Sequence, residues 1–159
     1  MPTALKPGDK APDFTMPSDE GGDIRLGDFK GRALVLYFYP KDDTSGCTSE
    51  AQAFTAAAGE FTALGASVVG VSKDSVKSHG KFRGKYGLKV RLGSDVEGKV
   101  VEDYGVWVEK SMYGRKYMGI ERSTFLIDQA GVIRQVWRKV SVTGHAAQVL
   151  EAVKGLTAS

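Results

Sequence analysis

Ala33-Leu-Val-Leu-Tyr-Phe-Tyr39 is the longest continuously apolar stretch of the chain, and Pro40 ends it. A short apolar run that is rich in β-prone residues is typical of a strand buried on both faces of a parallel sheet. The run is also far shorter than the roughly 20 residues that cross a bilayer, so the sequence predicts no transmembrane helix. We therefore take 33–39 as the central strand and work outward from it.

The residues after this strand predict a helix and then a second strand. Beyond the turn-rich segment 40–46, apolar side chains recur at steps of four and three, which places them on one helical face. They are Cys47, Ala51, Phe54, Ala58 and Phe61. This spacing predicts a helix over about 46–64, closed by Gly65, and the apolar run 67–71 predicts the next strand. Strand, helix and strand in about forty residues form a βαβ unit with parallel strands.

Five further segments complete the predicted sheet and its helices. We expect a helix over 74–86 and another that begins at Ser94, because Ser94-Asp-Val-Glu97 has the spacing of a capping box. Two β-type runs, 123–128 and 132–137, flank a glycine-bearing loop and predict a hairpin at an antiparallel edge of the sheet. The segment 144–154 has the apolar spacing of a final amphipathic helix.

The first thirty residues differ from the rest, since they contain four of the five prolines and few apolar residues. We expect them to form an irregular N-terminal extension with short edge strands near Phe14 and Ile24. The whole chain, residues 1–159, then reads as one α/β domain with a central mixed sheet flanked by helices, because it shows no repeat or linker.

Composition excludes several classes of protein. The 159 residues are 42% hydrophobic and 26% charged, which fits neither a disordered nor a coiled-coil chain. The net charge of +3 comes from basic residues interleaved with acidic ones, so no basic stripe for nucleic acid is visible. The N-terminus lacks the apolar segment of a secretory signal, and one cysteine cannot form an internal disulfide. We therefore expect a cytoplasmic protein that binds neither nucleic acid nor membrane.

Cys47 admits two interpretations. A lone intracellular cysteine is most often a small buried hydrophobe. This one, however, follows a strand end and a polar turn, with Thr44 or Ser45 as the expected N-cap, so it occupies the first turn of a helix. Free backbone N–H groups and the helix dipole stabilise an anion there, and the carboxyl edge of parallel strands is where open α/β sheets bind ligands. The position favours a nucleophilic thiolate.

The cation that would assist this thiolate has to be inferred from position, because the chain has 22 lysines and arginines. Arg122 directly precedes the apolar run of the late strand, so it would lie at a sheet edge from which it could reach the cysteine turn. A solvated surface arginine is the ordinary alternative. Thr44, Thr48 and Glu50 are open to a similar alternative, since turn and first-turn residues often act only as caps.

Other motifs fail on inspection. Gly93–Lys99 has the spacing of a phosphate-binding P-loop, but Val100 stands where the motif needs Ser or Thr, and Asp95 and Glu97 would repel phosphate. His79 and His145 have no cysteine or carboxylate at ligand spacing, so we expect surface or capping roles and no zinc site.

An aromatic and methionine-rich group lies between the third predicted helix and the late hairpin. It consists of Trp107, Met112, Tyr113, Tyr117 and Met118. Such a group can line a pocket, but a satellite core is the more common role.

The segment Tyr37-Phe-Tyr-Pro-Lys-Asp-Asp-Thr-Ser-Gly-Cys-Thr-Ser-Glu50 resembles the active site of peroxiredoxins, in particular the Q-type or bacterioferritin-comigratory-protein (BCP) class. The similarity extends to 8–14, 70–76, 110–114 and 117–128, and so covers nearly the whole chain. It implies a thioredoxin-like fold and a thiol peroxidase without metal, haem or flavin.

The resemblance also implies roles for individual residues. Cys47 would be the peroxidatic cysteine, whose thiolate attacks a hydroperoxide and becomes a sulfenic acid. Arg122 and the Thr44 hydroxyl would stabilise the thiolate and the departing oxygen. Pro40 would limit access of water and thiols to the sulfur, and Glu50 would orient the arginine.

The sequence departs from the family in two places. Many relatives carry a resolving cysteine five residues after the peroxidatic one, where this chain has Gln52, and the other known location, near Arg83, has none. Ser45 stands where relatives usually have proline. We therefore expect recycling by an external thiol, such as thioredoxin, glutaredoxin or a low-molecular-weight thiol, and a monomeric enzyme. The alternative is a redox-sensing or interaction module with an oxidisable Cys47 and little turnover.

Overall fold

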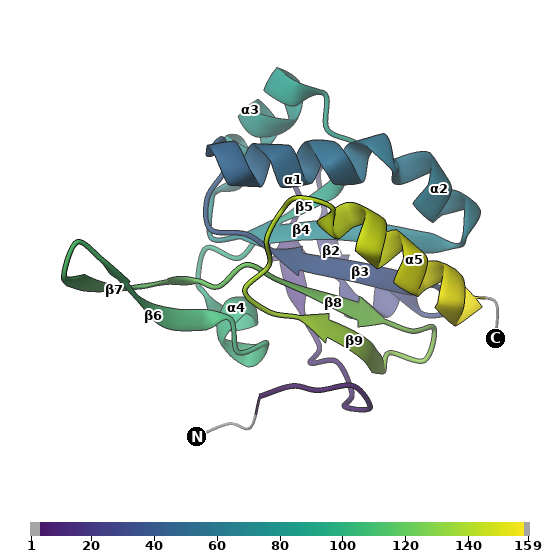
Figure 1. Ribbon diagram of the computed structural model, residues 1–159. Helices are drawn as coiled ribbons and strands as arrows, with labels where there is room; N and C mark the ends of the chain where they lie inside the picture. The colour runs from purple at the N-terminus through teal and green to yellow at the C-terminus, as the bar shows by residue number, and fades with distance from the viewer. Residues whose placement is uncertain (1–3, 158–159) are drawn as a thin grey trace.

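The computed structural model describes residues 4–157, and a five-stranded mixed sheet forms its centre (Figure 1). The strand order is β5-β4-β3-β8-β9. These strands are β3 (Ala33–Phe38), β4 (Ala66–Ser72), β5 (Arg91–Ser94), β8 (Ser123–Ile127) and β9 (Ile133–Trp137). The three strands β3, β4 and β5 are parallel, whereas β8 runs antiparallel to both β3 and β9. The predicted central strand, βαβ unit and late antiparallel hairpin are therefore present.

Helices and short strands cover the two faces of this sheet. One face packs against α1 (Ser45–Ala56), α2 (Ala58–Ala63), α3 (Val76–Tyr86) and α5 (His145–Thr157). The other is covered by β1 (Thr15–Pro17), β2 (Asp23–Arg25), the 3-10 helix η1 (Leu26–Phe29) and α4 (Lys99–Asp103). Every helix in the described part of the chain is too short or too polar to traverse a lipid bilayer.

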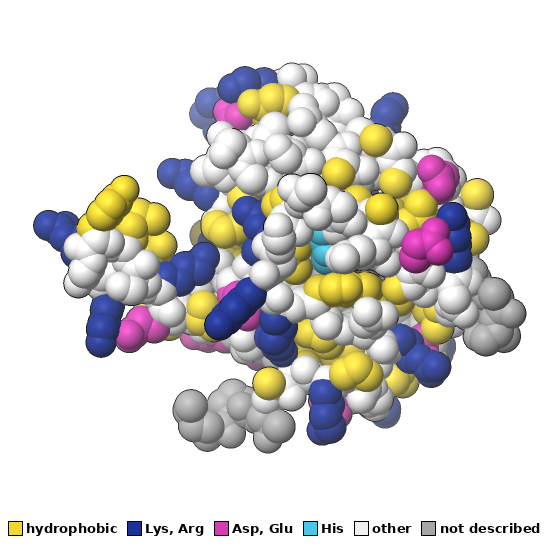
Figure 2. Space-filling view, viewed as in Figure 1, with side chains coloured by type: hydrophobic (Ala, Val, Ile, Leu, Met, Phe, Trp, Pro, Cys, Tyr) yellow, Lys and Arg dark blue, Asp and Glu magenta, His cyan; other side chains and the backbone are white. Residues whose placement is uncertain are grey.

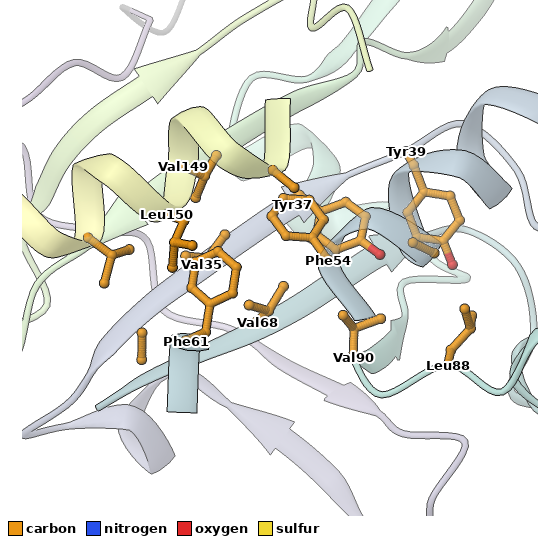
Figure 3. Packing of buried hydrophobic residues seen from close by; sticks show 14 of the residues in the cluster. Val35, Tyr37, Tyr39, Phe54, Phe61, Val68, Leu88, Val90, Val149 and Leu150 are labelled. Carbon is orange, nitrogen blue, oxygen red and sulfur yellow. The ribbon is translucent and has the colours of Figure 1, made fainter. Parts of the chain in front are cut away.

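Burial on both faces explains why the β3 segment is continuously apolar. Val35 and Tyr37 belong to the core on the α1 face, together with Phe54 and Phe61 (Figure 3). Leu34, Leu36 and Phe38, which alternate with them along the strand, belong to the core on the opposite face. All six residues of β3 are buried, so each face of the strand contributes to one of the two cores.

The predicted first helix is divided in two. Helix α1 ends at Ala56 and α2 begins at Ala58, because Ala57 (φ −94°, ψ 2°) leaves helical geometry. Short strands do occur next to Phe14 and at Ile24, as β1 and β2. The first three residues of the predicted extension, which include Pro2, lie outside the described residues.

The prediction of a helix that begins at Ser94 is wrong. Ser94 is the last residue of β5, and its neighbour in the sheet is Ser72 of β4. Helix α4 begins five residues later, and the Asp95 carboxylate accepts a hydrogen bond from the backbone N–H of Val101 (2.8 Å). Sheet pairing and burial of this segment override the local capping signal.

A second hairpin was not predicted. Strands β6 (Trp107–Met112) and β7 (Arg115–Ile120) pair only with each other and project from the domain (Figure 1). Tyr113 and Gly114 at its tip both have positive φ, as a two-residue hairpin turn requires. Apolar side chains are exposed toward this tip beside lysine and arginine (Figure 2). Met112, Tyr113, Tyr117 and Met118 are thus not the pocket lining or satellite core that the sequence suggested.

Close packing between neighbouring strands makes Gly70 of β4 a test of the core. A Cβ at this position would lie 2.7 Å from the hydroxyl of Tyr37, whose ring stacks on Phe54 at 4.8 Å between centroids. Since overpacking costs about 1–3 kcal/mol, we predict that Gly70→Ala lowers the free energy of unfolding by that amount in chemical denaturation.

Gly80 in α3 provides the matched control, because nothing lies within 4 Å of a Cβ there. Gly80→Ala is expected to raise stability by up to about 1 kcal/mol, the helix-propensity difference. Equal effects of the two substitutions would contradict this account of the core.

Candidate active site

Cys47 lies at the point where the chain leaves the sheet and enters its first long helix. It is the third residue of α1, whose N-cap is Thr44, and the helix starts just beyond the carboxyl end of β3 (Figure 1). The thiol is only 1% exposed. Because the first amides of a helix have no intrahelical acceptors and carry the positive end of the dipole, this position favours a negatively charged sulfur.

Arg122 bridges the thiol and a buried carboxylate. Its Nη2 donates a hydrogen bond to Cys47 Sγ at 3.3 Å, and its Nη1 donates to Glu50 Oε1 at 2.6 Å. The Arg122 side chain is 16% exposed and that of Glu50 is 1% exposed, so solvent screens this ion pair only weakly. Cys47 and Glu50 are three residues apart on α1 and face the same arginine.

Burial and the charge of Arg122 shift the pKa of Glu50 in opposite directions. Removal from water raises the pKa of this carboxyl to about 7, while the Arg122 guanidinium opposes the rise. The same carboxylate and Cys47 raise the pKa of Arg122 despite its partial burial, so the arginine stays a permanent cation. One fixed positive charge therefore lies between two groups that can each become negative.

Two residues of this region were not identified from the sequence. A Cβ on Gly46 would lie 3.2 Å from Arg122 Nη2, so the glycine lets the guanidinium approach the first turn of α1. Lys110 of β6 is half-buried, and its pKa is lowered by burial and by the nearby charge of Arg122, while Cys47 opposes this shift. Neither residue lies close to Arg122 in sequence, and only the fold brings them together.

The other two predicted site residues lie in the turn before α1. Thr44 is exposed, and its hydroxyl donates to the backbone carbonyl of Lys41 at 2.9 Å. Pro40 is also exposed and follows the end of β3. Cys47, Arg122 and Glu50 are thus in direct contact, whereas the Thr44 hydroxyl bonds within the turn.

Both histidines are buried, which corrects the expected surface or capping roles. His145 is 2% exposed; its Nε2 lies 2.7 Å from Thr124 Oγ1, and burial lowers its pKa to about 4. His79 is fully buried beside two carboxylates, Asp42 and Asp74. The fold supplies these partners from elements that are distant in sequence.

Within residues 4–157, Asp42, Asp74 and His79 form the one group that brings three metal-ligand types together, with ligand atoms within 4.8 Å of one another. These atoms already accept or share hydrogen bonds with protein groups, including Ser72 and Ser78. We interpret the group as a hydrogen-bonding network.

Comparison with known proteins identifies the family. Residues 7–136 match the model of the AhpC/TSA family. A putative peroxiredoxin bcp of Coxiella burnetii is 52% identical over 147 residues, which are 92% of this chain and 97% of the relative. Peroxiredoxin Bcp of Bacillus subtilis is 47% identical, with 94% of this chain and 96% of the relative covered.

Solved structures agree. The bacterioferritin comigratory protein of Xanthomonas campestris, described with its alkyl peroxide reduction activity, superposes with a TM-score of 0.88 at 42% identity over 98% of each chain. A PrxQ mutant from Xylella fastidiosa has a TM-score of 0.91 at 38% identity, covering 97% of this chain and 98% of its own. These relationships confirm the thioredoxin-like fold and the family resemblance seen in the sequence.

The chain therefore belongs to the AhpC/TSA family, as a peroxiredoxin of the BCP or PrxQ class, and is a thiol-dependent peroxidase.

Proposed function

We propose that Cys47 is the peroxidatic cysteine and that Arg122 is the cation that activates it. The observation that carries this assignment is the hydrogen bond from Arg122 Nη2 to Cys47 Sγ at the first turn of α1. A guanidinium and a helix N-terminus together stabilise a thiolate, which is the reactive form of cysteine. Hydrogen peroxide and small organic hydroperoxides are the proposed substrates.

The reaction follows from these groups. The Cys47 thiolate attacks one oxygen of the hydroperoxide, an S–O bond forms and the O–O bond breaks. The other oxygen leaves as hydroxide or alkoxide and takes up a proton, which gives water or an alcohol and leaves Cys47 as a sulfenic acid. Arg122 can donate to the departing oxygen while Glu50 holds the guanidinium in place. In the proposed site the Thr44 hydroxyl also stabilises the thiolate and the departing oxygen, and Pro40 limits access of water and thiols to the sulfur.

Recycling requires a thiol from outside the chain, since Cys47 is its single cysteine. We propose that a thiol attacks the sulfenic acid to give a mixed disulfide and water, and that a second thiol releases Cys47 and leaves as a disulfide. The two thiols can belong to one thioredoxin or glutaredoxin, or to two low-molecular-weight molecules. By the family resemblance, many relatives have a resolving cysteine at the position of Gln52, and the alternative location lies near Arg83; this chain has no cysteine at either place.

We also propose that residues 1–159 act as a single domain and as a cytoplasmic monomer that binds no nucleic acid. The two cores share one sheet, which supports a single folding unit. A single cysteine suits a reducing compartment. Acidic residues interleaved with basic ones disfavour nucleic-acid binding.

Replacement of the two central residues tests the assignment. We predict that Cys47→Ser abolishes peroxide consumption, because a hydroxyl is not ionised near neutral pH. Arg122→Ala should lower the second-order rate of Cys47 oxidation roughly 100-fold or more, the usual cost of one preorganised donor in a reaction that develops negative charge. Stopped-flow measurements with hydrogen peroxide give the rates of peroxide consumption and of Cys47 oxidation.

Arg115→Ala is the control, since it removes the same charge from the exposed start of β7. It should leave the rate within about twofold of the original. Turnover by the Cys47→Ser protein would refute the role of Cys47.

Glu50 provides a prediction on pH. Above about pH 7 the carboxyl is ionised and holds Arg122 through an ion pair; below it the carboxyl takes up a proton and this pair is lost. We therefore expect hydrogen peroxide to oxidise Cys47 of the Glu50→Gln variant roughly tenfold more slowly than Cys47 of the original protein at pH 8, an effect of about 1.4 kcal/mol. Near pH 6 the two rates should be similar.

The control for this pH series is Glu60→Gln, which removes a carboxylate from the exposed face of α2. The ratio of its Cys47 oxidation rate to that of the original protein should stay near one at every pH. A Glu50→Gln ratio that does not change with pH would mean that ionisation of Glu50 is irrelevant to the reaction.

The recycling step can be followed by intact-protein mass. One equivalent of hydrogen peroxide should add one oxygen atom, and a suitable thiol should remove it through a mixed disulfide over many cycles, while the protein sediments as a 17.1 kDa species. Stoichiometric oxidation without turnover in the presence of thioredoxin, glutaredoxin or small thiols would instead support the redox-sensing alternative.

A further inference from the structure

The segment 40–44, called here the catalytic turn, connects β3 to α1 and sets where the helix begins. Its two consecutive aspartates attach it to α3. Asp42 reaches the first half of that helix, while Asp43 binds Lys85 Nζ (2.9 Å) and the Tyr86 hydroxyl (2.6 Å) at its end. The Asp43 contacts are exposed and screened by water, so Asp42 is the stronger anchor.

Asp42 is buried, and every polar atom of its carboxylate has a donor. Oδ1 accepts from the Tyr39 hydroxyl at 2.5 Å, and Oδ2 accepts from Ser78 Oγ at 2.8 Å and lies 2.7 Å from His79 Nδ1. Its backbone N–H donates to Asp74 Oδ2 at 2.8 Å. The carboxylate is removed from water, yet these donors lower its pKa.

His79 completes the network on the other side. The ring is 0% exposed, and while Nδ1 faces Asp42, Nε2 lies 3.0 Å from the backbone carbonyl of Gly93 in β5. A carboxylate and a carbonyl are both acceptors, so the two bonds require a proton on each ring nitrogen. The titratable groups that face this ring are Tyr39 and Asp42. Asp74 joins the network through its hydrogen bond with the backbone N–H of Asp42. The His79 ring is thus held between the Asp42 carboxylate and a backbone carbonyl of the sheet.

We propose that the buried Asp42–His79 pair is the positioning device of the peroxidatic site. It fixes the catalytic turn to α3 and to the edge of β5, and through the turn it sets the first turn of α1 and Cys47 against Arg122. His79 contacts neither substrate nor sulfur, so it acts only through the turn. The inference rests on the proposed role of Cys47.

The physical basis is the sensitivity of in-line attack to geometry. A displacement of about 1 Å in a reacting group can cost roughly 100-fold in rate. Removing one partner of a buried pair leaves the other uncompensated, which is a strong perturbation of local structure. Loss of His79 or of the Asp42 charge should therefore move the turn without removing any group that touches the peroxide.

The experiment is a double-mutant cycle on the full chain with hydrogen peroxide as the probe. We expect Asp42→Asn and His79→Gln each to slow single-turnover oxidation of Cys47 about tenfold or more, and the double variant to be no slower than the singles, because both disrupt one interaction. His79→Asn, which keeps a donor near the Nδ1 position, should recover part of the rate. Alkylation of Cys47 by iodoacetamide reports the amount of thiolate that remains and needs no fixed approach, so it should fall less than the rate of oxidation does.

Arg83→Gln is the matched control on the same helix. Arg83 binds Asp19 through Nε and Nη2 and the carbonyls of Leu88 and Val90, but it does not contact the catalytic turn. It should lower the thermal midpoint, because it removes these hydrogen bonds, while leaving the oxidation rate within about twofold.

The outcomes separate the two proposals. If hydrogen peroxide fails to oxidise Cys47 in the unaltered protein, the proposed catalytic role of this cysteine is wrong. The positioning role is wrong if Cys47 of the unaltered protein reacts but Cys47 of the folded His79→Gln and His79→Asn variants is oxidised at the original rate. It is also wrong if Arg83→Gln slows the oxidation of Cys47 as much as His79→Gln does.

Discussion

The site depends on one guanidinium held between a buried carboxylate and a buried sulfur. Arg122 reaches both because of sheet register: Ser123 pairs with Phe38, so the residue before β8 lies beside the carboxyl end of β3, where α1 begins. Glu50 would be a costly buried anion without this partner, and Arg122 without Glu50 would be free to turn toward solvent. The antiparallel position of β8 is therefore what joins residues 75 positions apart into one site.

Helix α3 supports this contact indirectly, because it binds the turn that precedes α1. It holds the turn through Asp42 and Asp43 and is itself tied by Arg83 to the β1–β2 connection at Asp19. The family resemblance implies that some relatives place a resolving cysteine near this arginine. Here the same position forms four hydrogen bonds that hold the helix in place. A fixed α3 agrees with a chain that relies on an external thiol.

The sequence predicted those parts of the fold that are encoded locally. The run 33–39 identifies β3 because burial on both faces demands apolar residues at every position, and the spacing after Cys47 identifies α1. The Ser94 capping box failed because pairing with β4 is a long-range interaction. The β6–β7 hairpin was missed because its outer half is exposed on both sides and so has no apolar alternation to detect.

The candidate site shows the same division. Cys47 could be placed at a helix start and Arg122 at a sheet edge, since both follow from the order of elements. Gly46, Lys110 and His79 could not be found in this way, because their importance arises from contacts across the fold. A glycine in the first turn of a helix is the one local signal that was available, since it marks a close approach by another group.

Burial of the sulfur imposes different demands on the two half-reactions. Cys47 is 1% exposed, and rigid positioning helps a small peroxide to react in the proposed site. On the proposed role of Cys47, a thiol carried by a protein is much larger than a peroxide, so we expect its attack on the sulfenic acid to need movement of the catalytic turn or of the first turn of α1. The anchors of the turn suit this order of events: the water-exposed Asp43 contacts cost little to break, whereas the buried Asp42–His79 pair resists opening. If the pair positions the site as proposed, its stability sets a balance, in which a stronger anchor favours oxidation and a weaker one favours reduction by an external thiol.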